Sequence, residues 1–133
     1  MHTVTIVLLP RGTPDLDDAV ATLLRPHYDA RLDYFTIGRE SLDDLESAKL
    51  LGLENDEDNA KNVCFVDRLR PDFVPGAIVT PDGQWFDLND QGWRFIAGDS
   101  AENRAAWERW TAQVRSLFDA HRDHIAFEVD THS

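Results

Sequence analysis

Residues 77–87, AIVTPDGQWFD, constrain the fold of this chain more than any other stretch. Two runs rich in β-branched and aromatic residues flank the sequence Pro81-Asp82-Gly83. Proline presets the backbone for a tight turn, and glycine accepts the positive φ that such a turn requires. The stretch therefore predicts a β-hairpin with two neighbouring antiparallel strands.

Two longer apolar runs lie towards the two ends of the sequence. Residues 3–9, TVTIVLL, and residues 125–130, IAFEVD, are apolar enough for burial on both faces of a sheet. We predict that these two strands pair with each other inside the sheet. Residues 32–38 and 63–66 predict further strands, and GWRFIAG at 92–98 predicts a third antiparallel strand beside the hairpin.

Three segments have the apolar spacing of helices. The first begins near Pro14 and stops at Pro26, the second spans residues 41–52, and the third is capped by Asp99 with Glu102.

The third helix carries Trp107 and Trp110, and both are expected to pack against the sheet. The complete order β-α-β-α-β-β-β-α-β predicts one α+β domain over residues 1–133. Its helices should pack on a mixed, mainly antiparallel sheet.

The composition narrows the class of protein. A formal net charge of −12 disfavours direct binding to nucleic acid or to an anionic membrane, and no stretch approaches the roughly 18 apolar residues of a membrane span. The start of the sequence has no signal-peptide pattern, and the single cysteine, Cys64, excludes an intramolecular disulfide. These features predict a cytoplasmic protein.

The acidic run at 54–58 is either a solvated surface or a site for a basic protein partner.

The heptapeptide DYFTIGR at 33–39 is the first candidate for a binding site. Asp33 and Tyr34 belong to the predicted strand, while Gly38 allows a turn that presents Arg39 at the strand end. A guanidinium can bind a carboxylate or phosphate through two hydrogen bonds, so Arg39 with Tyr34 predicts one wall of a ligand site. Alternatively, these residues are ordinary aromatic and ion-pairing positions of a strand.

The tail HRDHIAFEVDTHS is the second candidate. Asp130 and His132 lie two residues apart on a strand and point to the same side, so they predict an acid–base pair in which Asp130 holds a neutral His132. His121 and His124 share a helical face, which would allow a transition-metal site with the strand residues. We favour packing and capping roles for these two histidines and predict no metal site.

Trp85 and Trp93 flank the hairpin. They either stack on a planar ligand or cover the edge of the sheet. Cys64, within the apolar run VCFV, is expected to be a buried, inert thiol.

Four stretches together resemble an uncharacterised group of small bacterial and bacteriophage proteins: DYFTIGR, VTPDGQWFD, the Gly-Trp pair at 92–93 and DHIAFEVDTH. Members carry an Asp-aromatic-aromatic-x-x-Gly-Gly-Arg-Trp stretch, a Val-Thr-Pro-Asp-Gly-x-Trp hairpin and a terminal Val-Asp-Cys-His. The chain departs from this pattern in having one glycine before Arg39, Glu40 in place of the tryptophan and Thr131 in place of the cysteine. The resemblance points to the following positions: Asp33, Tyr34, Gly38, Arg39, Trp85, Trp93, Asp130 and His132.

The sequence thus predicts a pocket for a small-molecule or nucleotide-related ligand, lined by Arg39, Trp85 and His132. It does not decide between binding and hydrolysis, and it indicates no cofactor. The alternative is an acidic protein that blocks a basic partner by imitating nucleic acid, as a phage anti-defence factor would.

Overall fold

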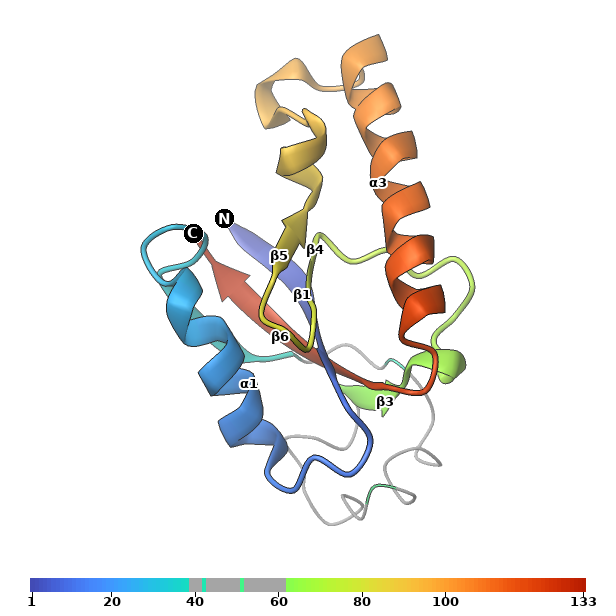
Figure 1. Cartoon of the computed structure of the whole chain (residues 1–133). Helices are drawn as coiled ribbons and strands as arrows, with labels where there is room; N and C mark the ends of the chain where they lie inside the picture. The colour runs from blue at the N-terminus through green and yellow to red at the C-terminus, as the bar shows by residue number, and fades with distance from the viewer. Residues whose placement is uncertain (39–41, 43–50, 52–61) are drawn as a thin grey trace.

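A computed structural model of the chain describes residues 1–38, 42, 51 and 62–133. Within these residues, six strands form one sheet with the order β2-β6-β1-β4-β5, and β3 pairs with β6 beside β2. The parallel β1–β4 pair is the exception in an otherwise antiparallel sheet. This arrangement confirms the predicted α+β class with a mixed, mainly antiparallel sheet (Figure 1).

The centre of the sheet is the antiparallel pair of β1 (His2–Leu9) and β6 (Ile125–His132). Every residue of one strand has a partner in the other, from His2 opposite His132 to Leu9 opposite Ile125. The prediction that the first and last strands pair inside the sheet is therefore confirmed. The two termini consequently lie side by side at one end of the sheet (Figure 1).

Short strands complete the sheet on both sides. β2 (Tyr34–Ile37) and β3 (Val63–Phe65) both pair with β6, one after the other along its length. On the other side, β4 (Ala77–Val79) and β5 (Trp85–Asp87) form the predicted hairpin. Its turn closes through a hydrogen bond of 2.8 Å from Gly83 N to Thr80 O, and Gly83 has the positive φ of 87° that the sequence predicted.

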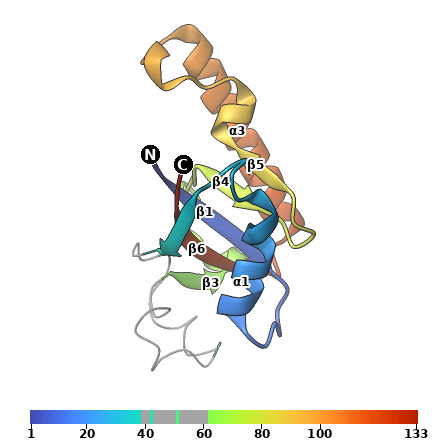
Figure 2. The same cartoon turned by 90° about the vertical axis from the view of Figure 1, so that its left-hand side faces the viewer.

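The helices cover opposite faces of the sheet (Figure 2). α1 (Leu16–Leu24) packs on the face that carries Val7 and Phe127. α3 (Ala101–Ala120) packs on the face that carries Ile6 and Ala126. We call these two surfaces the α1 face and the α3 face. No helix in the described part of the chain is both long and apolar enough to span a membrane.

Three details differ from the sequence predictions. Residues 92–98 form no strand; they include a single 3-10 turn, Phe95–Ala97, and lead into α3 away from the sheet. The N-cap of α3 is Ser100 rather than Asp99, because the Ser100 side chain accepts the hydrogen bond from Asn103 N. The predicted helix at 41–52 and the acidic run at 54–58 lie outside the described residues, Leu42 and Leu51 excepted.

The two tryptophans of α3 also differ from each other. Trp110 is fully buried, and its indole Nε1 donates a hydrogen bond of 2.8 Å to Pro75 O. Trp107 lies three residues earlier on the helix and is 41% exposed. The prediction that both pack against the sheet is therefore correct for Trp110 and wrong for Trp107.

This difference generates a stability prediction. Trp110→Ala should lower the free energy of unfolding by about 3–5 kcal/mol, because it leaves a large cavity and an unpaired carbonyl. Trp107→Ala, the matched control on the same helix, should change it by less than about 1 kcal/mol. Urea denaturation of both variants measures the two values, and equal losses would contradict this account of the helix.

Candidate functional site

Three aromatic side chains form a row across the end of the sheet that carries the termini. His2 on β1, His132 on β6 and Tyr34 on β2 are direct cross-strand neighbours. Direct neighbours in adjacent strands project to the same face with Cβ atoms about 5 Å apart. Together with the carboxylates Asp33 and Asp130, these residues form what we call the histidine cluster, on the α3 face but beyond the helix.

Each imidazole of the histidine cluster contacts one carboxylate. His132 Nδ1 lies 2.8 Å from Asp33 Oδ1, and His2 Nδ1 lies 3.0 Å from Asp130 Oδ1. The predicted pairing of Asp130 with His132 is therefore wrong. Residues i and i+2 of a strand are separated by about 7 Å along its axis, whereas residues on adjacent strands are closer.

Stacking fixes the plane of the His132 ring. Its centroid lies 4.7 Å from the Tyr34 ring at an interplanar angle of 11°, while His2 approaches edge-on at 4.9 Å. Because Asp33 accepts a hydrogen bond from Nδ1, the neutral imidazole carries its proton there and keeps a lone pair on Nε2. The Met1 amino nitrogen lies 3.4 Å from this Nε2. The arrangement orients the Nε2 lone pair of His132 towards the Met1 amino group, so a ligand that uses Nε2 as a base would displace this contact.

The charge state of Asp33 reflects this contact. The hydrogen bond from His132 lowers the pKa of the Asp33 carboxyl below its ordinary value of 3.8. Desolvation opposes this with a smaller effect, and the charge of His132 adds a still smaller lowering. A similar contact lowers the pKa of Asp123, whose carboxyl accepts a hydrogen bond from His124 at the start of β6. The second pair provides an internal control for the first.

Gly38 follows β2 and lies opposite Glu128 of β6, to which its backbone N donates a hydrogen bond of 3.1 Å. Its φ is not in the left-handed region. A Cβ at this position would overlap the side chain of Glu128, a buried residue of β6 on the α3 face. A larger residue at this position would therefore require the Glu128 side chain to move. The structure does not describe Arg39, which follows it.

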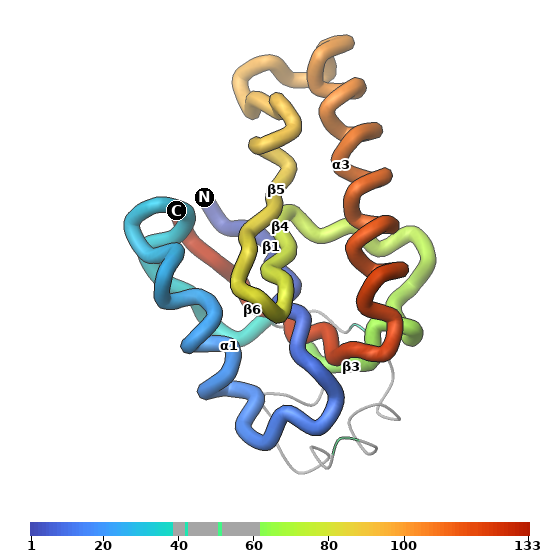
Figure 3. The backbone as a smooth tube through the Cα atoms, in the orientation of Figure 1, coloured from blue at the N-terminus to red at the C-terminus, as the bar shows by residue number. Residues whose placement is uncertain are grey.

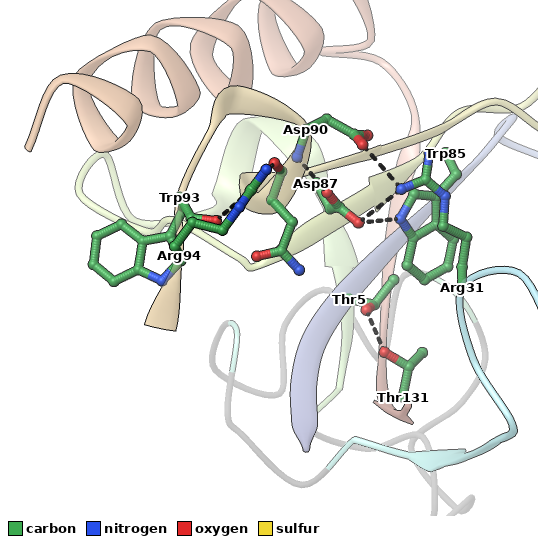
Figure 4. Close-up of polar contacts among 9 residues, drawn as sticks. Thr5, Arg31, Trp85, Asp87, Asp90, Trp93, Arg94 and Thr131 are labelled. Carbon is green, nitrogen blue, oxygen red and sulfur yellow. Dashed lines mark hydrogen bonds and ion pairs between the residues drawn. The ribbon is translucent and has the colours of Figure 1, made fainter. Parts of the chain in front are cut away.

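A second polar group occupies the opposite face of the sheet. Trp85 Nε1 donates a hydrogen bond of 2.8 Å to Asp87 Oδ2 (Figure 4). Arg31 Nη1 lies 3.3 Å from the same carboxylate oxygen and 3.0 Å from Asp90 Oδ1. Trp85, Asp87 and Arg31 border a cavity of about 120 Å³ that is also lined by Trp93 and Thr131. We call it the Trp85 cavity.

The Trp85 cavity is small for a ligand site. Pockets for drug-sized molecules usually measure about 300–1,000 Å³, and an apolar cavity of about 150 Å³ holds a benzene molecule. Trp85 and Trp93 both line this cavity.

The sequence predicted a single pocket lined by Arg39, Trp85 and His132. The structure does not bring Trp85 and His132 together in one pocket. Trp85 shares the α1 face with Val79, its partner in the hairpin, whereas His132 lies on the α3 face. Side chains alternate between the faces of a sheet, so the sheet itself separates the two residues.

The histidines at the beginning of β6 do not join the histidine cluster. His121 Nδ1 lies 2.7 Å from Leu117 O in the last turn of α3, and His124 Nδ1 lies 2.8 Å from Asp123 Oδ1. The eight-residue strand β6 separates them from His132 by about 25 Å. In the described ranges, no three His, Cys, Asp or Glu residues are grouped as metal ligands would be.

The sequence analysis missed His2, Arg31 and Asp87. His2 could have been found, because the predicted pairing of the first and last strands implies that it lies opposite His132. Arg31 and Asp87 gave no such signal, since they meet only through the packing of the loop after α1 against β5.

No known protein family, curated protein or solved structure matches this chain. The likeness to the bacterial and bacteriophage group therefore depends on the motifs alone, and membership of that group is a proposal.

The contact between His132 and Asp33 generates a titration prediction. His132→Ala should raise the pKa of Asp33 towards 3.8, because the hydrogen bond and the charge that lower it are lost. Since the pKa is lower in the folded state, the contact stabilises the fold above about pH 4 and is lost as the pH falls through the folded-state pKa. The ¹³C resonance of the Asp33 carboxyl measures this pKa.

His124→Ala is the matched control for this titration. It should raise the pKa of Asp123 and leave that of Asp33 unchanged, because the two pairs lie at opposite ends of β6. An unchanged Asp33 titration in His132→Ala would contradict the described geometry.

Proposed function

We propose that this chain binds a small, nucleotide-related molecule at the histidine cluster, as a binding or hydrolytic protein. The supporting observation is that two imidazole–carboxylate pairs, His132–Asp33 and His2–Asp130, lie side by side at an exposed end of the sheet. Four polar side chains from three parts of the sequence meet there. Such convergence of titratable groups is typical of sites for acid–base chemistry.

Fold stability does not account for this arrangement. Ion pairs between exposed side chains contribute about 0–1 kcal/mol, and three of the four partners are more than 40% exposed at the side chain. A role in contact with a ligand is the better explanation for keeping them together.

The geometry suggests a role for each residue. His132 would act as the base through Nε2, while Asp33 holds Nδ1 and stabilises the imidazolium that forms. His2 with Asp130 would supply a second proton donor or acceptor 4.9 Å away. Tyr34 is 45% exposed and offers part of its ring to a planar ligand.

Two predicted ligand contacts stay part of the proposal. Arg39 would bind an anionic group of the ligand, because a guanidinium matches the geometry of phosphate and carboxylate. Trp85 and Trp93 would hold a second, separate planar molecule no larger than a benzene ring in the Trp85 cavity, because the sheet lies between this cavity and the histidine cluster.

The setting of this function is also proposed. We infer a bacterial or bacteriophage protein of the cytoplasm, from the motif resemblance and from the single cysteine, which is buried. The alternative function, an acidic protein that blocks a basic partner, is supported by the net charge of −12. Its proposed surface at 54–58 lies outside the described residues.

An NMR titration tests the proposed site. ¹⁵N-labelled imidazole resonances are followed while inorganic phosphate, adenosine monophosphate or benzoate is added to separate samples. At least one probe should shift His2 and His132 with saturation, because both rings border the same surface. His132→Ala should abolish saturable binding and leave the melting temperature nearly unchanged, since its contacts are largely exposed.

His124→Ala is the control, since it removes a histidine with an equivalent carboxylate contact elsewhere. It should retain saturable binding of the same probe. The proposal fails if no probe shifts His132, if both variants respond alike, or if His132→Ala unfolds the domain.

A further inference from the structure

The segment between β5 and α3 projects beyond the sheet together with the first turns of α3 (Figure 3). Large apolar side chains are exposed on this projection. Ile96 is 95% exposed and Phe95 is 79% exposed, and Trp107 of α3 is 41% exposed close by. We call the projection the distal arm. Contiguous exposed apolar residues of this size mark interaction surfaces more often than ordinary protein surface.

The turn that carries Phe95 and Ile96 is held in one conformation. The buried side chain of Asn103 accepts a hydrogen bond of 2.9 Å from Arg94 N. Its amide donates to Arg94 O at 2.7 Å and to Gly98 O at 2.8 Å. A single side chain thus clamps both ends of the turn. A preorganised surface loses less conformational entropy when it binds a partner.

A groove runs along the base of this turn. Its volume is about 680 Å³, within the usual range of ligand pockets, and Trp93, Phe95 and Trp107 supply its apolar lining. The indole rings of Trp93 and Trp107 lie 6.4 Å apart at an angle of 60°, so the groove has an aromatic floor. Burial of a bulky side chain between such rings is a common source of binding energy.

The charged residues around the groove determine which side chains of a bound segment would be favoured there. Arg104 is paired with Asp99 at 3.0 Å, and Arg94 donates to the backbone carbonyl of Trp93 at 2.9 Å. Glu108 lines the groove and belongs to no ion pair within the part of the chain that the structure describes. A cationic side chain next to an apolar anchor would therefore find a carboxylate at the rim.

We propose that the distal groove docks a protein segment in which a bulky apolar side chain is flanked by Lys or Arg. The overall charge of −12 favours this partner over anionic lipid and over a second copy of the same chain, because both would be repelled. The histidine cluster contributes no residue to the groove, whereas Trp93 lines both the groove and the Trp85 cavity.

Selection from a library of random peptides tests the proposal. The intact chain is the target, and the double variant Phe95→Ser/Ile96→Ser is used for counter-selection. Enriched peptides should carry Trp, Phe or Leu beside at least one Lys or Arg. Binding of one labelled enriched peptide is then measured by fluorescence anisotropy.

Single variants locate the contact. Phe95→Ala and Trp107→Ala should each weaken binding about tenfold or more, as truncation of an aromatic anchor does. Glu108→Gln should weaken it about two- to fivefold and reduce its dependence on salt. Tyr28→Ala, which removes an exposed aromatic ring near the end of α1, is the matched control and should leave the affinity unchanged.

Several results would overturn the inference. They are the absence of a common motif among the selected peptides, an acidic motif, or equal binding to the double variant. Two further results would assign the groove to another occupant: saturable binding of phosphatidylcholine–phosphatidylserine vesicles through Phe95 and Ile96, or a dimer in sedimentation analysis that the double variant dissolves.

Discussion

The antiparallel pairing of β1 with β6 is the interaction on which the rest of the structure depends. It joins the first and last strands over eight residues each, and every other strand adds to one side of this pair. β2 and β3 bind the outer edge of β6, and the hairpin binds the outer edge of β1 through β4. Both central strands therefore have partners on two sides, so their backbone polar groups are satisfied away from solvent. Without this long-range pair, the three-residue strands would have no strand edge with which to form hydrogen bonds.

The same pairing determines where polar residues collect. At the end of the sheet with the termini, the apolar pattern of both strands gives way to His2, Thr3, Asp130 and His132. Alternation sends the histidines and Asp130 to the α3 face and Thr3 to the α1 face, with the Trp85 cavity. One stretch of sheet thus presents two different polar surfaces. The first is exposed and titratable, whereas the second is small and bordered by an indole and the Arg31–Asp87 pair.

The distal arm depends on a different kind of constraint. α3 is longer than the sheet needs, and its first turns extend past the core that Trp110 and Val114 complete. Asn103 uses its buried amide to shape the preceding turn instead of packing against apolar neighbours. The helix therefore has two roles: from Trp110 onwards it closes the core, whereas Trp107, one turn earlier, contributes to an exposed aromatic surface.

The sequence by itself determined the α+β architecture and part of the candidate site. Turn chemistry and helical periodicity predicted the hairpin and the last helix because these signals are local, and the two long apolar runs predicted the central β1–β6 pair because each can be buried on both faces. The sequence patterns failed at residues 92–98, where aromatic residues typical of a strand instead form a turn clamped by Asn103. The sequence also indicated His132, Asp130 and Asp33, but it assigned His132 to the wrong carboxylate. Only the tertiary structure decided that pairing and the separation of Trp85 from His132, because register and strand order, unlike residue spacing, determine which side chains meet across a sheet.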